Sequence, residues 1–338
     1  MPATMRAVVI TRPGGPEVLE LRELPRPEPG ADQVLVRVRA TALNRSDVLQ
    51  RAGRYPAPAA APAGAAAQVP GLEFAGEVAE LGPGVRRWRE GDRVFGIVGG
   101  AAHAEYVVAH ERALAAVPPS LPWHEAGAAP EAFITAHDAL VSQAALRPGE
   151  LVLVHAVGSG VGLAAVQLAR ALGAIPYGTA RSAWKLDRAR ELGMEDGFAP
   201  PADLAGLRER ALAWSNGLGV DVVLDLVGGP YVEASAGLLA LKGRLMLVGA
   251  VGGGDARLPL GRVMAQRLTI RGTVLRSRPI EERILATAAF EREVVPWLAA
   301  GALRPVIDAR FPLADVRQAH ERMESNDSFG KIVLDVLA

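Results

Sequence analysis

The spacing of hydrophobic residues changes twice along this chain of 338 residues. Up to about residue 120, short apolar runs are broken by proline and glycine, which predicts antiparallel strands at 6–11, 18–24, 33–42, 72–81, 92–98 and 105–108. Beyond residue 122, strand and helix patterns alternate, as they do in a parallel sheet covered by helices. After about residue 267 the pattern changes back, with expected strands at 268–275 and 331–336 and expected helices around 281–300 and 314–324.

These changes predict an α/β protein in which one domain is inserted into another. The first domain is expected to begin with residues 1–122 and to be completed by residues 267–338. The inserted domain is expected to span residues 123–266. Mostly antiparallel strands are expected in the first domain, and a doubly wound parallel sheet in the inserted one.

The most informative segment follows residue 150, where a buried strand, a glycine turn and an amphipathic helix succeed one another. Gly158, Gly160 and Gly162 let backbone N–H groups approach an anion, and the helix expected over 160–172 directs the positive end of its dipole there. The pattern predicts a site for the pyrophosphate of a dinucleotide. Only the last of the three glycines matches the G-x-G-x-x-G fingerprint, so an ordinary tight turn remains the alternative.

A second strand, expected at 174–179, reports on the kind of dinucleotide. NAD-specific sites place Asp or Glu at the end of this strand, where the carboxylate accepts a hydrogen bond from the ribose 2′-OH. This chain has no carboxylate there; it has Ala180, Arg181 and, one turn into the helix after Ser182, Lys185. Two cations favour a 2′-phosphate, so NADPH is predicted to be the preferred cofactor. A solvated helix start is the alternative role for both cations.

Composition narrows the range of partners. Half of the residues are hydrophobic and 22% are charged, and the formal net charge is zero, which gives no general attraction to nucleic acid or to an anionic membrane. The chain has no cysteine, which excludes disulfides, thiolate catalysis, iron–sulfur clusters and thiolate zinc sites. The first apolar run is too short for a secretory signal, and His155 and Gln167 interrupt the apolar stretch at 151–169. We therefore expect a cytoplasmic protein with no membrane contact.

Separated motifs carry a resemblance to a known family. They lie at residues 42–47, 70–76, 130–136, 155–162 and 329–334. In these motifs the chain resembles the zinc-free, zeta-crystallin-like quinone oxidoreductases of the medium-chain dehydrogenase/reductase superfamily. Residues 252–255 and 275–278 are most similar to the tumour-suppressor-inducible quinone reductase subgroup. The resemblance implies a GroES-like catalytic domain with an inserted Rossmann domain.

The same resemblance indicates a site without metal. Zinc-dependent alcohol dehydrogenases of the superfamily carry a Cys where this chain has Asn44 and a His where it has Leu72. Neither an amide nor an alkyl group supplies the thiolate or imidazole that zinc takes. The four-cysteine structural lobe of those enzymes is also missing. We therefore expect no metal.

The resemblance implies that NADPH donates a hydride to a quinone or another conjugated carbonyl. Asn44 and Tyr55 are the candidate donors to the acceptor oxygen, where negative charge grows. Thr135 is expected beside the nicotinamide ring, with a helix cap or core hydroxyl as its alternative role. For Asn44 the alternative is a turn residue, and for residues 54–69 the alternatives are a surface loop or a flap with Tyr55 at its tip.

Several segments are expected to hold the cofactor. By resemblance, the backbone of two segments, one after residue 248 and one at residues 275–276, would hold the carboxamide end. Lys331 would lie near the cofactor cleft, although a lysine that opens a terminal strand is ordinarily solvated. The predicted cofactor-binding residues are Gly158, Ser159, Gly160, Val161, Gly162, Ala180, Arg181, Lys185, Val227, Gly249, Ala250, Val251, Leu275, Arg276 and Lys331.

Two other functions stay open at this point. The acceptor could be an enone or enoyl thioester, because loops set the pocket, or the protein could bind NADPH without catalysis. Nucleic-acid binding is not expected from the neutral charge. The strand at 268–274 resembles the family's edge strand that pairs across a twofold axis, so a homodimer is expected.

Overall fold

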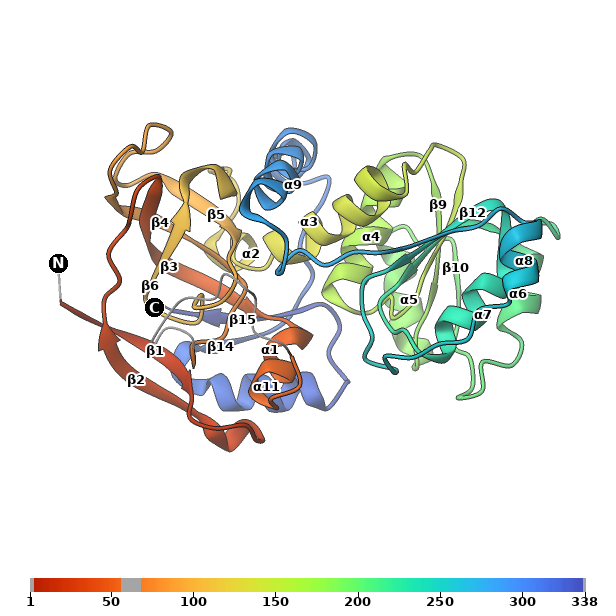
Figure 1. The fold of residues 1–338 in the computed structure, drawn as a ribbon, viewed down its shortest axis with the longest axis horizontal. Helices are drawn as coiled ribbons and strands as arrows, with labels where there is room; N and C mark the ends of the chain where they lie inside the picture. Colours follow the sequence, from red (N-terminus) through yellow and green to blue (C-terminus); the bar gives the residue numbers. More distant parts are fainter. Residues whose placement is uncertain (1–2, 56–67, 337–338) are drawn as a thin grey trace. The chain divides into compact units, whose positions relative to one another are not determined.

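The computed structural model describes residues 3–55 and 68–336, and the chain forms two compact units (Figure 1). Unit 1 comprises Met1–Ile134 and Leu275–Ala338, and unit 2 comprises Thr135–Val274. The α/β architecture, with a mostly antiparallel sheet and a separate parallel sheet, is confirmed. No helix in the described part of the chain is both long enough and apolar enough to cross a membrane.

A mostly antiparallel sheet forms the centre of unit 1. Its strands run in the order β14-β15-β3-β4-β5-β7, with β6 paired to β3. Hydrophobic side chains of several strands, among them Val36, Phe74 and Leu334, form its core. The sheet strands are β3 (Gln33–Leu43), β4 (Glu73–Leu81), β5 (Arg93–Ile97), β6 (Tyr106–His110), β7 (Leu114–Ala116), β14 (Ile307–Pro312) and β15 (Lys331–Asp335).

A hairpin and several helices complete unit 1. The hairpin pairs β1 (Thr4–Ile10) with β2 (Leu19–Pro25). Helix α1 begins directly where β3 ends, and α11 contacts β14 and β15. The helices are α1 (Arg45–Arg51), α2 (Trp123–Ala126), α3 (Pro130–His137, which continues into unit 2), α9 (Ile280–Glu293), α10 (Val295–Ala299) and α11 (Val316–Glu324).

Unit 2 is a parallel six-stranded sheet with the order β10-β9-β8-β11-β12-β13. The chain therefore starts at the sheet's centre, moves out to one edge, and returns to build the other half, which is the strand order of a dinucleotide-binding fold. Its strands are β8 (Leu151–Val154), β9 (Ile175–Thr179), β10 (Asp196–Phe198), β11 (Val220–Asp225), β12 (Leu239–Leu247) and β13 (Thr269–Gly272). Its helices are α4 (Gly160–Ala171), α5 (Ala183–Glu191), α6 (Leu207–Trp214), α7 (Pro230–Leu238) and α8 (Leu260–Ala265).

The boundaries of the two compact units differ from the domain boundaries that the sequence pattern predicts. The strand expected at 268–275 is β13, and it pairs in parallel with β12, so residues up to Val274 belong to unit 2. Residues 123–134 belong to unit 1, where α2 contacts β3 and β4. Hydrophobic spacing predicts a strand or a helix, but it does not say which sheet supplies the hydrogen-bonding partner.

Candidate active site and cofactor site

The glycine turn follows β8 and opens α4. Ser159 is the N-cap residue of α4, and its Oγ accepts a hydrogen bond of 3.1 Å from the Gly162 N–H. A Cβ on Gly162 would lie 2.6 Å from the carbonyl oxygen of Val157, so the third glycine of the turn lets the helix start pack on the preceding backbone. The first N–H groups of a helix have no acceptor within the helix, so the start of α4 can bind an anion.

A buried histidine fixes the strand end below this turn. The His155 ring lies 2.9 Å from Thr179 Oγ1 at one nitrogen and 2.9 Å from Ser235 Oγ at the other. Burial lowers the pKa of His155 to about 3, so the ring is neutral. The side chain ties β8 to β9 and α7, and it has no free nitrogen for a ligand.

Asp225 ends β11, the strand that neighbours β8 on the side where the strand order reverses. Its Oδ1 accepts hydrogen bonds from the N–H groups of Val227 (2.8 Å) and Gly228 (2.9 Å). Its Oδ2 is buried and has no partner in the described part of the chain. Burial raises the pKa of Asp225. This orphaned oxygen, at the switch point where α/β sheets bind their ligands, fits a hydroxyl group of a bound nucleotide.

The residues after β9 include three of the predicted cofactor residues, Ala180, Arg181 and Lys185. Ala180 is buried and Arg181 is exposed. Lys185 is half-buried on α5, with its Nζ 5.3 Å from the ring centroid of Trp184. The Arg181 charge acts to lower the pKa of Tyr231, although burial raises it overall. Both predicted cations of this region thus lie beside the carboxyl end of the parallel sheet.

A hollow of about 210 Å³ lies among the loops that follow β11 and β12. The two loops are tied together by a hydrogen bond of 2.7 Å from the Gly252 N–H to the Val227 carbonyl. Gly249 and Ala250 line the hollow, and Val251 beside them is exposed. Three predicted cofactor residues, Val227, Gly249 and Ala250, therefore lie together at the carboxyl end of the sheet.

Unit 1 holds a group of polar side chains that we call the polar cluster: Asn44, Asp47, Tyr55, Glu73, Glu131, Arg276 and Lys331. Glu73 and Lys331 form its centre, an ion pair of 2.6 Å between side chains that are 0% and 5% exposed. Lys331 also donates to Leu43 O (3.0 Å) and Asn44 Oδ1 (2.6 Å). All three N–H groups of the Lys331 ammonium are used inside unit 1. None of them is left to make the expected contact with a cofactor.

Asn44 and Asp47 fix the start of α1. They form a capping box, in which the Asn44 N–H donates to Asp47 Oδ2 at 2.7 Å. The Asn44 amide nitrogen donates to Glu73 Oε1 at 2.9 Å. Asn44 is therefore a helix cap that is also joined to both members of the buried ion pair, and most of its amide is occupied.

Glu131 lies at the start of α3, and its backbone N–H donates to Glu73 Oε2 at 2.9 Å. Its own Oε2 is buried without a partner in the described chain. Burial, followed by the nearby Glu73 carboxylate, raises the pKa of Glu131 to about 7. The carboxyl group is thus close to half protonated at neutral pH.

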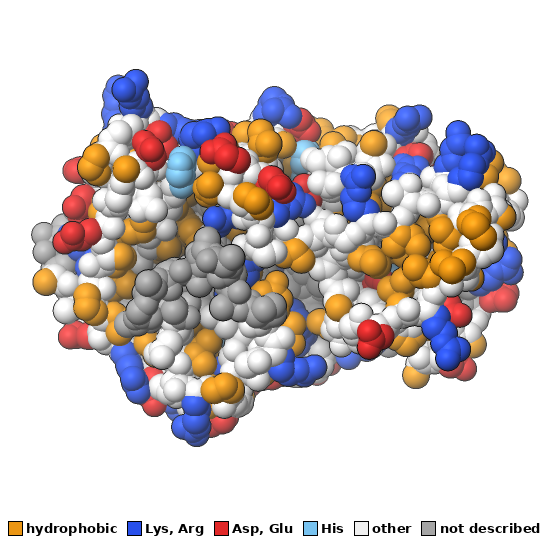
Figure 2. All heavy atoms as spheres, in the orientation of Figure 1, with side chains coloured by type: hydrophobic (Ala, Val, Ile, Leu, Met, Phe, Trp, Pro, Cys, Tyr) orange, Lys and Arg blue, Asp and Glu red, His pale blue; other side chains and the backbone are white. Residues whose placement is uncertain are grey.

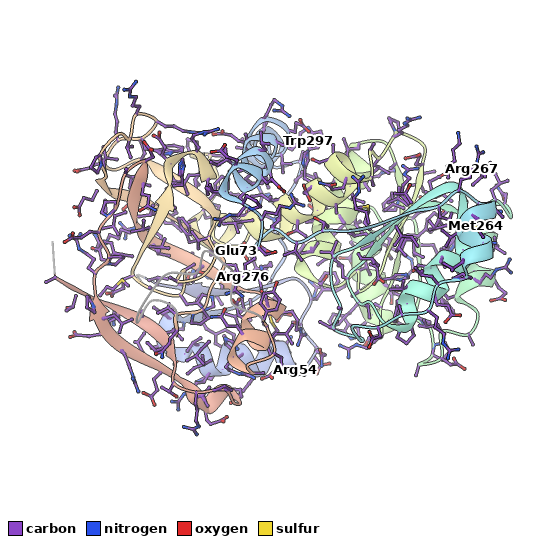
Figure 3. All side chains as sticks on the ribbon, in the orientation of Figure 1. Arg54, Glu73, Met264, Arg267, Arg276 and Trp297 are labelled. Carbon is purple, nitrogen blue, oxygen red and sulfur yellow. The ribbon has the colours of Figure 1, made fainter. Side chains whose placement is uncertain are left out.

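Arg276 and Tyr55 form the open side of the polar cluster. Arg276 donates from Nε to Gly99 O and from Nη2 to Gln50 Oε1, both at 2.9 Å. Its Nη1 is buried and has no partner in the described residues. The guanidinium carbon lies 5.0 Å from the Tyr55 ring centroid. Figure 3 labels Arg276 and Glu73 in unit 1. Burial raises the pKa of Tyr55, which therefore keeps its proton.

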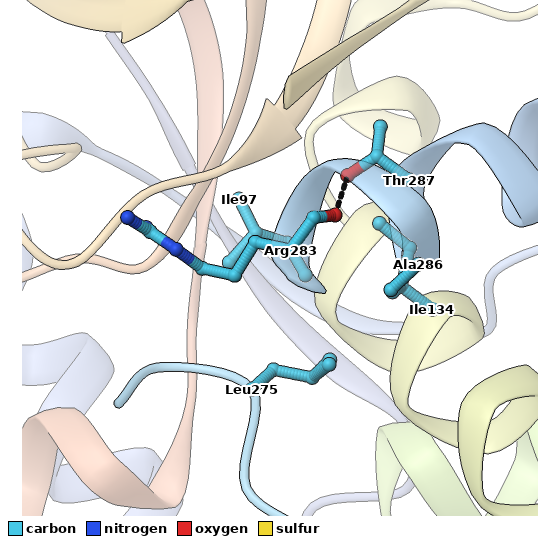
Figure 4. Close-up of a pocket in the computed structure, with 6 residues that line it drawn as sticks. All are labelled: Ile97, Ile134, Leu275, Arg283, Ala286 and Thr287. Atoms are coloured by element: carbon cyan, nitrogen blue, oxygen red, sulfur yellow. Dashed lines mark hydrogen bonds between the residues drawn. The ribbon is translucent and has the colours of Figure 1, made fainter. Parts of the chain in front are cut away.

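Another hollow, which lies in unit 1, is too small for a substrate. Its lining is mostly apolar, with Leu275 and Arg283 on opposite sides (Figure 4). Its volume is about 10 Å³, which is about the room that one water molecule needs. Leu275 is buried against this hollow, whereas Arg276, the next residue, belongs to the polar cluster.

Thr135 and the segment expected as a flap remain to be placed. Thr135 is buried in α3, and its hydroxyl has no partner among the described residues. Most of the segment expected as a flap, residues 56–67, lies outside the described residues. Glu73, Glu131 and Asp225 were not predicted as site residues. Their signal in the sequence was a carboxylate in an otherwise apolar stretch, which is costly to bury unless it is paired or functional.

Comparison with known proteins places the chain in a family. Residues 30–119 match the alcohol dehydrogenase GroES-like domain, and residues 160–291 match the zinc-binding dehydrogenase family. The quinone oxidoreductase of Lama guanicoe is 32% identical over 334 residues, which are 98% of this chain and 97% of that protein. The chain belongs to the medium-chain dehydrogenase/reductase superfamily. It is an oxidoreductase related over its full length to quinone oxidoreductases.

Other relatives differ in size or in what they bind. The polyketide synthase GfsB of Streptomyces halstedii is 38% identical over 304 residues, but this chain spans only 5% of its length. A mycobacterial protein solved in complex with NADPH has 30% sequence identity and a TM-score of 0.85, and the match covers 98% of this chain and 100% of that one. In the described part of this chain, no group of three or more His, Asp or Glu side chains is arranged to hold a metal ion.

Proposed function

We propose that the protein is an NADPH-dependent reductase of quinones or other conjugated carbonyls that works without a metal. The main observation behind this proposal concerns the polar cluster of unit 1. Two of its hydrogen-bond donors, the Tyr55 hydroxyl and Arg276 Nη1, lie close together, whereas the donors of Asn44 and Lys331 are already used within the cluster. Unit 2 supplies a dinucleotide-type sheet with a glycine turn at its centre. The full-length relatives named quinone oxidoreductase support the acceptor class.

The residues of unit 2 would hold the cofactor. The start of α4 would bind the pyrophosphate, and Asp225 Oδ2 would accept a hydrogen bond from a nucleotide hydroxyl. Arg181 and Lys185 would meet the 2′-phosphate, and the mycobacterial relative solved with NADPH supports this choice. When bound, the reduced nicotinamide supplies the hydride.

The residues of unit 1 would orient and polarise the acceptor. Negative charge grows on the acceptor oxygen as it is reduced, and one fixed donor there is worth about 3 kcal/mol, or a factor of roughly a hundred to a thousand in rate. Tyr55 donates as a neutral phenol because its pKa is raised. Arg276 adds a charged donor whose Nη1 has no other partner in the described residues. Asn44 positions Glu73 and Lys331, and its role as a direct donor stays a prediction.

Anaerobic mixing with a panel of acceptors tests this function. NADPH absorbance is followed while purified protein meets a series of quinones, enones and conjugated acyl thioesters. The last class is included because a part of polyketide synthases resembles this chain, and preference for it would favour the second candidate, an enoyl reductase. Oxidation of NADPH with none of the three classes, or a turnover that required stoichiometric zinc, would sink the proposed function.

Replacing the two cations after β9 should weaken NADPH binding selectively. Removing one charge-assisted contact costs about 1.5 kcal/mol, which is roughly tenfold in affinity. Arg181→Ala and Lys185→Ala are each expected to raise the Kd for NADPH about tenfold and to leave the Kd for NADH unchanged, as calorimetry measures. Arg188→Ala, on the exposed side of the same helix, is the matched control. Equal losses for both cofactors would contradict the assignment.

We also propose that the protein forms a homodimer through unit 2. Strand β13 is the outer strand of the parallel sheet, and Leu260 and Met264 of α8 are 64% and 72% exposed. Figure 2 shows hydrophobic side chains gathered on the face of unit 2 in view, and Figure 3 labels Met264 there. A free sheet edge beside apolar side chains favours pairing with a second copy. Sedimentation velocity measures the state directly.

A further inference from the structure

We propose that Glu131, acting as a carboxylic acid, supplies the proton that the acceptor takes up when it is reduced. The inference rests on the proposed function, because a conjugated carbonyl that has received a hydride still lacks one proton. It adds to that function a catalytic residue that the sequence motifs did not single out. The argument comes from the charges around Glu131, from its unpartnered oxygen, and from the other groups of the polar cluster.

The charges around Glu131 balance only if it is protonated. The groups that face it are Glu73 from β4, Asp47 from α1, Lys331 from β15 and Arg276 from the segment before α9. Glu73 is paired with Lys331 at 2.6 Å, and the Arg276 charge is felt by Asp47 as well as by Glu131. Two carboxylates and two cations therefore cancel. An ionised Glu131 would add an uncompensated charge to a buried site.

The hydrogen bonds point the same way. A buried carboxylate oxygen needs a donor, but Oε2 of the half-buried Glu131 is itself buried and has none in the described residues. Lys331, the cation that acts most strongly on Glu131, spends its three N–H groups on Leu43, Asn44 and Glu73. A carboxylic acid fits this place better, because its O–H remains available to a ligand.

The other members of the polar cluster are poor proton sources. Burial raises the pKa of Tyr55 above that of an ordinary phenol. Burial lowers the pKa of Arg276, but a guanidinium still keeps its proton in a protein. Asp47 already accepts hydrogen bonds from the N–H groups of Asn44 and Gly71, one at each carboxyl oxygen. Glu131, with a pKa of about 7, is the group matched to proton transfer at neutral pH.

The proton transfer balances as follows. When bound, a reduced nicotinamide would supply a hydride, that is two electrons and one hydrogen, to a carbon of the acceptor, and the acceptor oxygen would be left with an extra electron pair. The O–H bond of Glu131 breaks and a new O–H bond forms on that oxygen. Glu131 is left as a carboxylate, which the nearby Arg276 charge stabilises, and it regains its proton from solvent.

The test compares pH profiles of Glu131→Gln with wild type. An acid must be protonated to act, so wild-type turnover is expected to be level below pH 7 and to fall above it. Glu131→Gln should lower kcat by roughly a hundredfold or more and abolish the fall near neutral pH. Glu131→Asp keeps an acid and should restore part of the rate together with the fall. Glu125→Gln, a half-buried glutamate of the preceding helix α2, is the matched control and should behave like wild type.

A second readout needs neither cofactor nor acceptor. Because the folded pKa of Glu131 is raised above that of the unfolded chain, its contribution to stability is present below pH 4.5 and is lost as pH rises through about 7. Glu131→Gln should remove this loss, so the difference in unfolding free energy between variant and wild type should grow between those two pH values and then level off. Urea denaturation of the full chain measures it.

The outcomes separate the inference from the proposed function. Full activity of Glu131→Gln with an unchanged pH profile overturns the role of Glu131 while the proposed function stands. A stability difference that does not change with pH shows that Glu131 is ionised when folded, which also overturns it. Wild-type protein that reduces no acceptor overturns the proposed function, and the stability comparison then still decides whether the buried carboxyl carries a proton.

Discussion

Replacing Lys331 with methionine is expected to lower the free energy of unfolding by about 3–5 kcal/mol, because removing one partner leaves a buried charge uncompensated. The Glu73 side chain is 0% exposed, and Lys331 supplies one of its short contacts, at 2.6 Å. Methionine fills similar space but carries no charge and no donor. The loss also releases the Leu43 carbonyl and Asn44 Oδ1 from their hydrogen bonds with the ammonium. Urea denaturation of the full-length protein, followed by tryptophan fluorescence, measures the effect.

Two further variants show whether charge is the cause. The double variant Glu73→Gln/Lys331→Met should be less destabilised than the sum of its single changes, because no charge is then left unpaired. Arg310→Met breaks an ion pair between Arg310 of β14 and Asp335 of β15, the strand that also holds Lys331. The Arg310 side chain, however, is 51% exposed. That change should cost at most about 1 kcal/mol. A Lys331→Met cost no larger than that of Arg310→Met would contradict the account.

The buried pair also shows the limit of reading this site from the sequence. Asn44 and Lys331 were both singled out, but as separate candidates, one for the acceptor and one for the cofactor. Their contact joins residues 287 positions apart, and the Glu73 contact spans 258 positions. No local pattern reports such a pairing. What the sequence does show is a charged residue in an apolar stretch, which would be costly to bury without a partner. Glu131 and Asp225 give the same signal.

Local features, by contrast, were predictable. The strand before the glycine turn, the helix that begins at Gly160 and the strand that follows this helix each depend on neighbouring residues. All three are present in the structure, as β8, α4 and β9. Strand β14 was missed because its side chains are half-buried or exposed, so hydrophobic residues do not mark it. The fold class was predicted because alternating strands and helices leave few arrangements of the chain.

The glycine turn carries the second large effect. Replacing Gly162 with alanine is expected to weaken NADPH binding by roughly tenfold to a hundredfold and to destabilise the protein by about 1–3 kcal/mol. The new Cβ would meet the carbonyl oxygen of Val157 at 2.6 Å and that of Ala156 at 2.8 Å. These are backbone atoms of the turn, so they cannot rotate away as a flexible side chain could. Helix α4 must move off the turn, and its first N–H groups then leave the place where they would meet the pyrophosphate.

Gly237 provides a control of opposite sign for this prediction. It lies inside α7, and a Cβ there would meet nothing within 4 Å. Gly237→Ala should therefore leave NADPH binding unchanged and stabilise the protein by about 0.5–1 kcal/mol, because alanine favours a helix more than glycine does. Calorimetry with NADPH and urea denaturation separate the two variants. If Gly162→Ala bound NADPH as tightly as Gly237→Ala, the pyrophosphate would have to lie away from the start of α4, and the turn would be only a strand-to-helix connection.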